Sequence, residues 1–329
     1  MKRRDFLINT AAGLAGIYAG AACARGESKK PPGPTAARSP VALVRRQDLF
    51  VAGTECDESK LQAMLEKALA LALGVKQAEE GLAQLFHGHT VGIKLNCLAG
   101  PALSPRPQLC RQLVALLGRA GVPPEKVIFF ERAERDLKKG GFEPRYSGGP
   151  LFLGHDSPGV GYEEEVAVSG RVGSCLSRVL TRKITALINF GVLKDHNLAG
   201  VAAAVKNLYG VIHNPNKFHD NNCDPYLADV LAFPEVQKKL KLNLLDATTA
   251  QCHGGPGYLP GHAWAFAGLL ASTDPLALDA VAWDIIEKRR RTTGLKSLEE
   301  ENRAPRWLRT AAQRGLGRAN LSEIEIVEG

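Results

Sequence analysis

The sequence predicts an α/β fold in which a mixed, mainly parallel sheet is flanked by helices on both faces. Three observations support this prediction. Apolar segments short enough to be strands alternate with amphipathic segments long enough to be helices. Residues 91–130 form the first complete set of strand, helix and strand, and such a unit places its two strands parallel in one sheet. The composition, with 45% hydrophobic and 23% charged residues, is typical of a globular protein.

The first half of the expected fold contains this unit and a loop. Residues 91–96 and 126–130 are apolar and predict strands. Residues 106–120 predict the helix between them, because their leucines recur at helical spacing. The glycine-rich residues 140–161 predict a loop or a short hairpin.

The second half begins with a strongly apolar strand over residues 184–190, and helical spacing predicts a helix over residues 199–209. A further strand is expected over residues 242–246. Asp224-Pro225 and Asp274-Pro275 each match a helix start, with aspartate as the cap and proline in the first turn. Asp279, later in the second of these helices, is expected to be a carboxylate on the helix face.

The N-terminus predicts export. Residues 1–24 combine a basic start, a short apolar segment and small residues at a cleavage site. Arg3-Arg4 followed by Phe6-Leu7 is typical of proteins that use the twin-arginine export machinery, although the arginines also fit a general secretory signal. Cleavage next to Cys23 would leave a soluble periplasmic protein, whereas acylation of Cys23 would tether the protein by a lipid. Either outcome is extracytoplasmic.

Residues 25–50 are rich in Pro, Lys, Arg and Ser and predict a flexible tether, and residues 51–329 predict a single α/β domain. The formal net charge is +8, but part of the excess lies in the signal, the tether and residues 288–291. We therefore expect a small anionic molecule, and not a nucleic acid, as the binding partner. None of the seven cysteines forms a CxxC pair, which argues against zinc-ribbon, iron–sulfur and haem-attachment sites.

Four ionisable residues, Lys194, Asp195, His196 and Lys206, follow the predicted strand over residues 184–190. Open parallel sheets bind ligands at the carboxyl ends of their strands, so this position favours a site. We expect His196 to act as a general acid or base, Asp195 to orient it, and the two lysines to hold a carboxylate or phosphate. The alternative is a solvated turn in which His196 caps a helix.

Contacts to a cofactor or substrate are expected from Lys94 and Asn96, at the end of the first strand, and from Gly200 and Asn207. Gly200 would allow close approach of the backbone, and a helix starting near it would direct amide groups at an anion. The sequence does not identify the cofactor, because it lacks both the GxGxxG and the Walker patterns.

A divalent transition metal is a further candidate ligand. His213, His219 and Cys223 lie within a dozen residues, and imidazole and thiolate groups are preferred ligands of such metals. Their spacing matches no strict metal motif. The alternative is an ordered loop whose Asn and Asp side chains bond to its own backbone.

Five segments together resemble the family known as domain of unknown function 362. The similarity extends from about Val91 to the C-terminus and implies an α/β fold without an established reaction. Several members resemble this chain in carrying a twin-arginine signal. The clustered cysteines of the ferredoxin-bearing members are absent, so their iron–sulfur role is not expected here. The matching segments are Gly92-Ile93-Lys94-Leu95-Asn96, residues 194–200, Lys206-Asn207, residues 219–226 and Ser272-Thr273-Asp274-Pro275 with Ala277-Leu278-Asp279.

His196, Ala199-Gly200 and Lys206 are also similar to an arrangement in the N-terminal domain of nickel-pincer lactate racemases. In those enzymes the lysine carries the cofactor and the histidine moves protons. Residues 201–205 replace the glycine-rich segment of the racemases, so the similarity implies only where a site lies. Two functions remain open. One is an exported enzyme that acts on a small anionic substrate by acid/base chemistry, with or without a metal; the other is a periplasmic metal- or cofactor-binding accessory protein without turnover.

Overall fold

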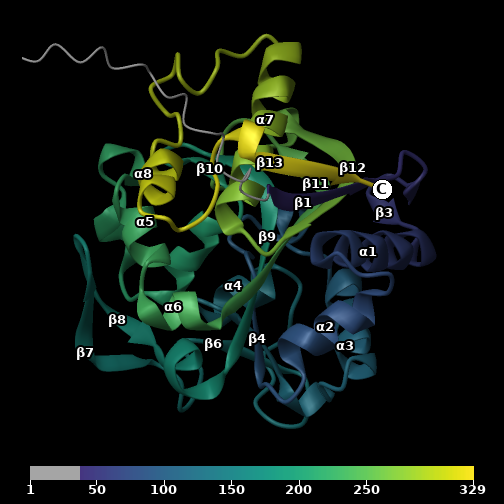
Figure 1. Ribbon diagram of the computed structural model, residues 1–329, viewed down its shortest axis with the longest axis vertical. Coiled ribbons are helices and arrows are strands. Elements are labelled where there is room, and N and C mark those ends of the chain that lie inside the picture. Colours follow the sequence, from purple (N-terminus) through teal and green to yellow (C-terminus); the bar gives the residue numbers. More distant parts are fainter. Residues whose placement is uncertain (1–37) are drawn as a thin grey trace, which may run out of the picture. The chain divides into compact units, whose positions relative to one another are not determined.

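The computed structural model describes residues 38–329, and their central feature is a nine-stranded sheet (Figure 1). The strand order is β13-β1-β12-β11-β9-β4-β5-β6, with β10 paired to β9. Pairing is parallel from β11 through β9, β4 and β5 to β6 and between β1 and β13, whereas β12 is antiparallel to both neighbours. The strands are β1 (Ser39–Arg45), β4 (Val91–Lys94), β5 (Val127–Glu131), β6 (Leu151–Gly154), β9 (Ala186–His196), β10 (Gly200–Ala202), β11 (Leu240–Gln251), β12 (Ala263–Ser272) and β13 (Ile324–Glu328).

Helices cover both faces of this sheet, which confirms the predicted fold class (Figure 1). Alternate residues of β9 point to opposite faces: Ile188 packs in the cluster with α1, α2 and α3, and Leu187 in the cluster with α5 and α8. The helices are α1 (Glu58–Leu73), α2 (Ala78–Phe86), α3 (Pro107–Arg119), α4 (Glu134–Lys139), α5 (Tyr226–Leu231), α6 (Pro234–Lys239), α7 (Pro275–Thr292) and α8 (Trp307–Gln313). Two hairpins lie outside the sheet, β2 (Phe50–Ala52) with β3 (Glu55–Cys56), and β7 (Tyr162–Ser169) with β8 (Val172–Ser177).

The folded unit begins earlier than predicted. Residues 39–45, expected in the tether, form β1, which pairs with β12 on one side and β13 on the other. Val41 and Val44 are buried, so the strand contributes to the core as well as to the hydrogen-bond ladder. The predicted signal peptide and Cys23 lie outside the described residues. Within residues 38–329, no helix combines the length and the apolar character needed to cross a membrane.

The predicted helix over residues 199–209 is wrong. β9 continues to His196, and the chain then turns back so that Ala202 pairs with Lys194 in β10. Gly200 makes this turn possible, because its φ is +77° and an added Cβ would lie 2.3 Å from the carbonyl oxygen of Arg303. A 3₁₀ helix, η4 (Val205–Val211), follows β10. Lys194, Asp195 and His196 therefore belong to the strand itself.

The two Asp-Pro pairs behave differently. Asp274 caps α7 as predicted, accepting hydrogen bonds from the amides of Leu276 at 2.9 Å and Ala277 at 3.1 Å. Asp224 does not cap α5, which begins at Tyr226, because residues 221–223 all have positive φ and bring the chain in through a left-handed turn. The glycine-rich segment, expected to be a loop or hairpin, also contains the edge strand β6.

Candidate functional site

A cavity of about 450 Å³ lies beyond the carboxyl ends of β4, β5 and β9. This is where a parallel sheet is expected to bind its ligand. Other parts of the wall come from η4, from the segment that includes η5 (Pro215–Phe218), and from Asp136 and Pro256. Seven of the side chains singled out in the sequence line this cavity: Lys94, Asn96, Lys194, His196, Lys206, Asn207 and His219.

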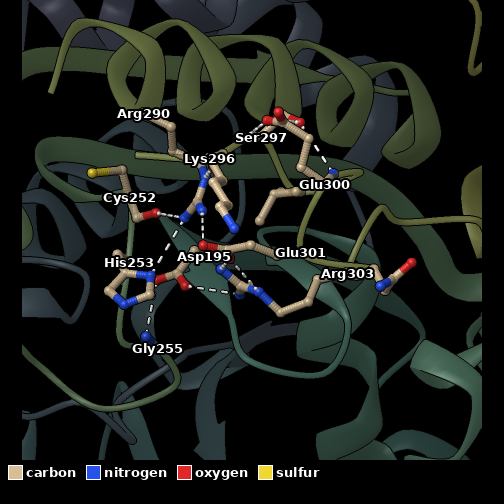
Figure 2. Close-up of polar contacts among 12 residues, drawn as sticks. Asp195, Cys252, His253, Gly255, Arg290, Lys296, Ser297, Glu300, Glu301 and Arg303 are labelled. Atoms are coloured by element: carbon tan, nitrogen blue, oxygen red, sulfur yellow. Dashed lines mark hydrogen bonds and ion pairs between the residues drawn. The ribbon is translucent and has the colours of Figure 1, made fainter. Parts of the chain in front are cut away.

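Asp195 does not line the cavity, which corrects its predicted role beside His196. Strand alternation turns it away from Lys194 and His196. Figure 2 shows its carboxylate accepting hydrogen bonds from the Gly255 amide at 2.9 Å and from Nη1 of Arg303 at 3.3 Å. Asp195 thus ties the end of β9 to two other segments, as a structural anchor.

The anchor continues into a partly buried ion-pair network (Figure 2). Arg303 also pairs with Glu301 at 2.5 Å, and Glu301 pairs at 2.7 Å with Arg290, whose side chain is fully buried. Arg290 further donates to the carbonyl oxygen of Cys252 at 2.8 Å. Part of the positive run over residues 288–291 is therefore internal structure and not a solvated face.

The three predicted metal ligands do not come together in the described residues. His213 is exposed and meets the ring of Tyr162 edge-on, while Cys223 is fully buried, and neither lines the cavity. His219 does line the cavity, and its ring meets Tyr209 edge-on with centroids 5.4 Å apart. In the described part of the chain, no three His, Cys, Asp or Glu residues are grouped in a way that could hold a metal ion. Gly200, predicted as a ligand contact, instead packs against residues 303–305.

Lys94 is fully engaged by the protein. Its Nζ donates to the carbonyl oxygen of Leu95 at 2.5 Å, to Oε2 of Glu131 at 3.0 Å and to Oδ1 of Asn207 at 3.2 Å. Three acceptors satisfy all three hydrogens of an ammonium group, and the carboxylate balances its charge. Gly210 leaves room for this side chain, because a Cβ there would lie 2.2 Å from Cε of Lys94.

Lys194 is buried with only neutral partners. Its side chain is 1% exposed, and Nζ donates to Oδ1 of Asn96 at 3.2 Å and to the carbonyl oxygen of Pro256 at 3.1 Å. Among residues 38–329, no carboxylate lies within 4.0 Å of this nitrogen. Burial lowers the pKa of Lys194 from 10.5 to about 8. One hydrogen of its ammonium group remains available to a ligand.

Lys206 has no acceptor among the described residues. Its Nζ lies 4.2 Å from the ring centroid of Tyr209, over the aromatic face. Burial lowers its pKa from 10.5 to about 8. Together with Arg132, which the sequence analysis missed, the cavity wall carries four basic side chains against two carboxylates, Glu131 and Asp136. This excess of positive charge favours an anion.

The two histidines of the cavity hold their protons on opposite nitrogens. Nδ1 of His196 accepts hydrogen bonds from the amides of Leu198 at 3.1 Å and Ala199 at 3.2 Å, so its hydrogen is on Nε2. His219 has Nδ1 at 3.1 Å from the carbonyl oxygen of Pro215, which only accepts, so its hydrogen is on Nδ1 and Nε2 keeps a lone pair. The rings stack with centroids 5.7 Å apart.

This arrangement changes the predicted role of His196. Burial, with a smaller effect of the Lys206 charge, lowers its pKa to about 2, so the ring stays neutral and acts as a hydrogen-bond donor. Burial also lowers the pKa of His219, which leaves it neutral near pH 7 with a basic nitrogen free. His219, expected as a metal ligand, therefore presents a basic nitrogen, whereas His196 presents a hydrogen.

A chain of buried amides connects the cavity to the middle of the sheet. Asn207 uses Nδ2 for the carbonyl oxygen of Lys94 and for Oδ1 of Asn189 at 2.8 Å, and its own Oδ1 accepts from Lys94. Asn189 donates to Oδ1 of Asn243 at 3.1 Å, and Asn243 donates to the carbonyl oxygen of Ser272 at 3.3 Å. Every polar atom of Asn207 is used, so it positions Lys94 and has no hydrogen left for a cofactor.

Asp279 is a second positioning residue that sequence reasoning missed, having placed it on a helix face. It is fully buried on α7 and accepts hydrogen bonds from the amides of Ala204 at 2.6 Å and Val205 at 2.8 Å. These amides begin η4, the element that carries Lys206. No local motif in the sequence signals a carboxylate that caps an element more than seventy residues away.

The family described as Domain of unknown function (DUF362) matches residues 91–284. The chain belongs to this family. The match spans β4 through most of α7 and includes every cavity side chain named above, while α8 and β13 follow it. DUF362 membership confirms the predicted family and is consistent with the α/β fold, but the family has no assigned activity. None of the curated proteins matches the chain.

Proposed function

We propose that the protein binds a small carboxylate or phosphate in the cavity and acts on it by acid/base chemistry. The observation that carries this proposal is the pair of lysines, Lys194 and Lys206, that line one cavity without a carboxylate partner among residues 38–329. Burying an unpaired cation is unfavourable, and a bound anion would offset much of that cost.

Each side chain has a role set by its free hydrogens. Lys194 and Arg132 hold the anionic group, and Nε2–H of His196 donates to an oxygen on which negative charge develops. His219 removes a proton through its free Nε2. The stacked rings bring a donor and a base to neighbouring positions, as proton abstraction next to a carboxyl or carbonyl group requires.

Binding is tested by isothermal titration calorimetry with inorganic phosphate, acetate, lactate and pyruvate. Loss of one charged hydrogen bond in Lys194→Met or Lys206→Met should weaken binding by roughly tenfold or more. Lys138→Met is the matched control, because Lys138 is exposed on α4 and does not line the cavity. Equal affinity in all variants, or no binding of any probe, would contradict the proposal.

Acid/base action is tested by proton NMR in D₂O, which follows exchange of the hydrogens next to the carboxylate of lactate, pyruvate and related acids. Catalysed exchange that disappears in His219→Asn supports an enzyme. Binding without exchange or any other turnover would favour an accessory binding protein.

We further propose that this chemistry takes place outside the cytoplasm, after export by the twin-arginine machinery. The support is the pattern of residues 1–24, with Arg3-Arg4 ahead of a short apolar segment. Replacement of both arginines by lysine should retain the protein in the cytoplasm. Mass spectrometry of the exported form distinguishes a lipid on Cys23 from simple cleavage.

A further inference from the structure

The three lysines of the cavity differ in how many ammonium hydrogens the protein uses. Lys94 donates to three oxygens, one of them a carboxylate oxygen, and Lys194 donates to two neutral oxygens. Lys206 donates to none within residues 38–329, and its nitrogen rests on the face of Tyr209. An amine that no protein oxygen holds in place is the one most free to approach a bound carbonyl group once it has given up a proton.

We propose that Lys206 is a nucleophile whose Nζ forms an imine with a 2-oxo acid bound in this cavity. The inference rests on the proposed function, because the carboxylate of such a substrate would occupy the anion site of Lys194 and Arg132. It adds a substrate class, since a 2-oxo acid carries an electrophilic carbonyl carbon directly beside its carboxylate. Neither Lys94 nor Lys194 is equally free to attack, because both are held by oxygens on the cavity wall.

The step balances without an oxidant or reductant. The lone pair of Nζ attacks the carbonyl carbon, a C–N bond forms, and the π electrons of the C=O bond move to oxygen. Nε2–H of His196 is the available donor to that oxygen. The nitrogen then loses its two hydrogens and the carbon its oxygen, so that one water leaves and a C=N bond remains. The imine would make the neighbouring C–H acidic, which suits the free Nε2 of His219 as base.

The environment favours the amine form of Lys206. With its pKa lowered to about 8, roughly a tenth of Lys206 is unprotonated near pH 7, against well under about one part in a thousand for an ordinary lysine. The amine also lies near both histidines, because the Tyr209 ring beneath it meets the His219 ring edge-on with centroids 5.4 Å apart, and the His219 ring stacks on that of His196.

The test is reductive trapping of the whole protein with pyruvate and sodium cyanoborohydride near pH 7, followed by peptide mass spectrometry. We expect one adduct per chain, on Lys206, formed roughly 100-fold faster than any adduct on the exposed Lys138. Lys206→Arg keeps the positive charge and should abolish the adduct, and Lys194→Met should slow trapping without moving it to another lysine.

Calorimetry with pyruvate and inorganic phosphate, run on the same samples, separates the two proposals. Anion binding with trapping at Lys206 no faster than at Lys138 would overturn the imine and leave the proposed function standing. Faster trapping at a different cavity lysine would overturn the assignment to Lys206. No binding of either anion, together with no selective trapping, would overturn both. The wild-type protein alone decides these outcomes, so they do not depend on how well the variants fold.

Discussion

Replacement of Lys194 by methionine should stabilise the protein near neutral pH while it weakens anion binding. Methionine fills a similar volume without a charge. The pKa of Lys194, lowered from 10.5 to about 8, means that its charged form costs the folded state about 3 kcal/mol. Two hydrogen bonds, to Asn96 and Pro256, are lost in the variant at about 1 kcal/mol each. The expected net gain in the free energy of unfolding is about 1 kcal/mol.

The pH dependence of this difference has a defined sign. Below pH 8 both the folded and the unfolded wild type carry the Lys194 charge, and the full cost is present. Between pH 8 and 10.5 the unfolded chain binds more protons than the folded one, so wild-type stability rises with pH. The stability advantage of the variant should therefore shrink over this interval. At the high-pH end the wild type should be the more stable form by about 2 kcal/mol, because it keeps the two hydrogen bonds that the variant lacks.

Urea denaturation of wild type and Lys194→Met, in a buffer free of small carboxylates and phosphate, measures both quantities. Lys138→Met serves as the control for loss of a positive charge at the surface. A variant less stable than wild type near neutral pH would refute the reasoning, because it would mean that the cavity already offsets the cost of burying the Lys194 charge. A difference that stays constant from pH 8 to 10.5 would refute it equally.

Three further predictions concern the same site. Affinity for phosphate or acetate should fall above pH 8 by roughly tenfold per pH unit as Lys194 and Lys206 lose their protons. Calorimetry at several pH values measures this affinity. An affinity that does not change with pH would show that binding does not depend on the charge of either lysine. His219→Asn should lower catalysed hydrogen exchange by roughly 100-fold or more while affinity changes little, whereas a matching loss of affinity would make His219 a binding residue. Asp279→Asn should destabilise the fold by about 2 kcal/mol, because its amide nitrogen would face the amide of Ala204 or Val205; thermal denaturation tests this, and an unchanged melting temperature would contradict the capping role.

The convergence of these side chains on one cavity could be predicted from the sequence, because it follows from topology. Lys94 is the last residue of the first strand of a parallel unit, and Lys194 and His196 lie at the end of a buried parallel strand beside it. All three are therefore expected at the same edge of the sheet. Glu131, at the end of β5, was available to the same reasoning and was missed. The family resemblance rested on these segments and was confirmed by the match over residues 91–284.

The roles of the side chains could not be predicted in the same way. The tautomers of His196 and His219 depend on which backbone groups face each ring, which residue spacing does not reveal. The metal prediction relied on nearness along the chain, but His213 is exposed against Tyr162 whereas Cys223 is fully buried. Helical spacing over residues 199–209 was genuine, but pairing of β10 with β9 overrode it.

The amide chain from Asn207 to Ser272 gives the site a built-in orientation. Each asparagine has an oxygen end and a nitrogen end, and a donor must face an acceptor at every junction. The Ser272 carbonyl on β12 can only accept, so it requires Asn243, then Asn189, then Asn207 to face one way. If one amide flipped, two donors would meet at one junction and two acceptors at the next. A backbone atom three strands away from the cation therefore determines that Lys94 meets an oxygen and not an amide nitrogen.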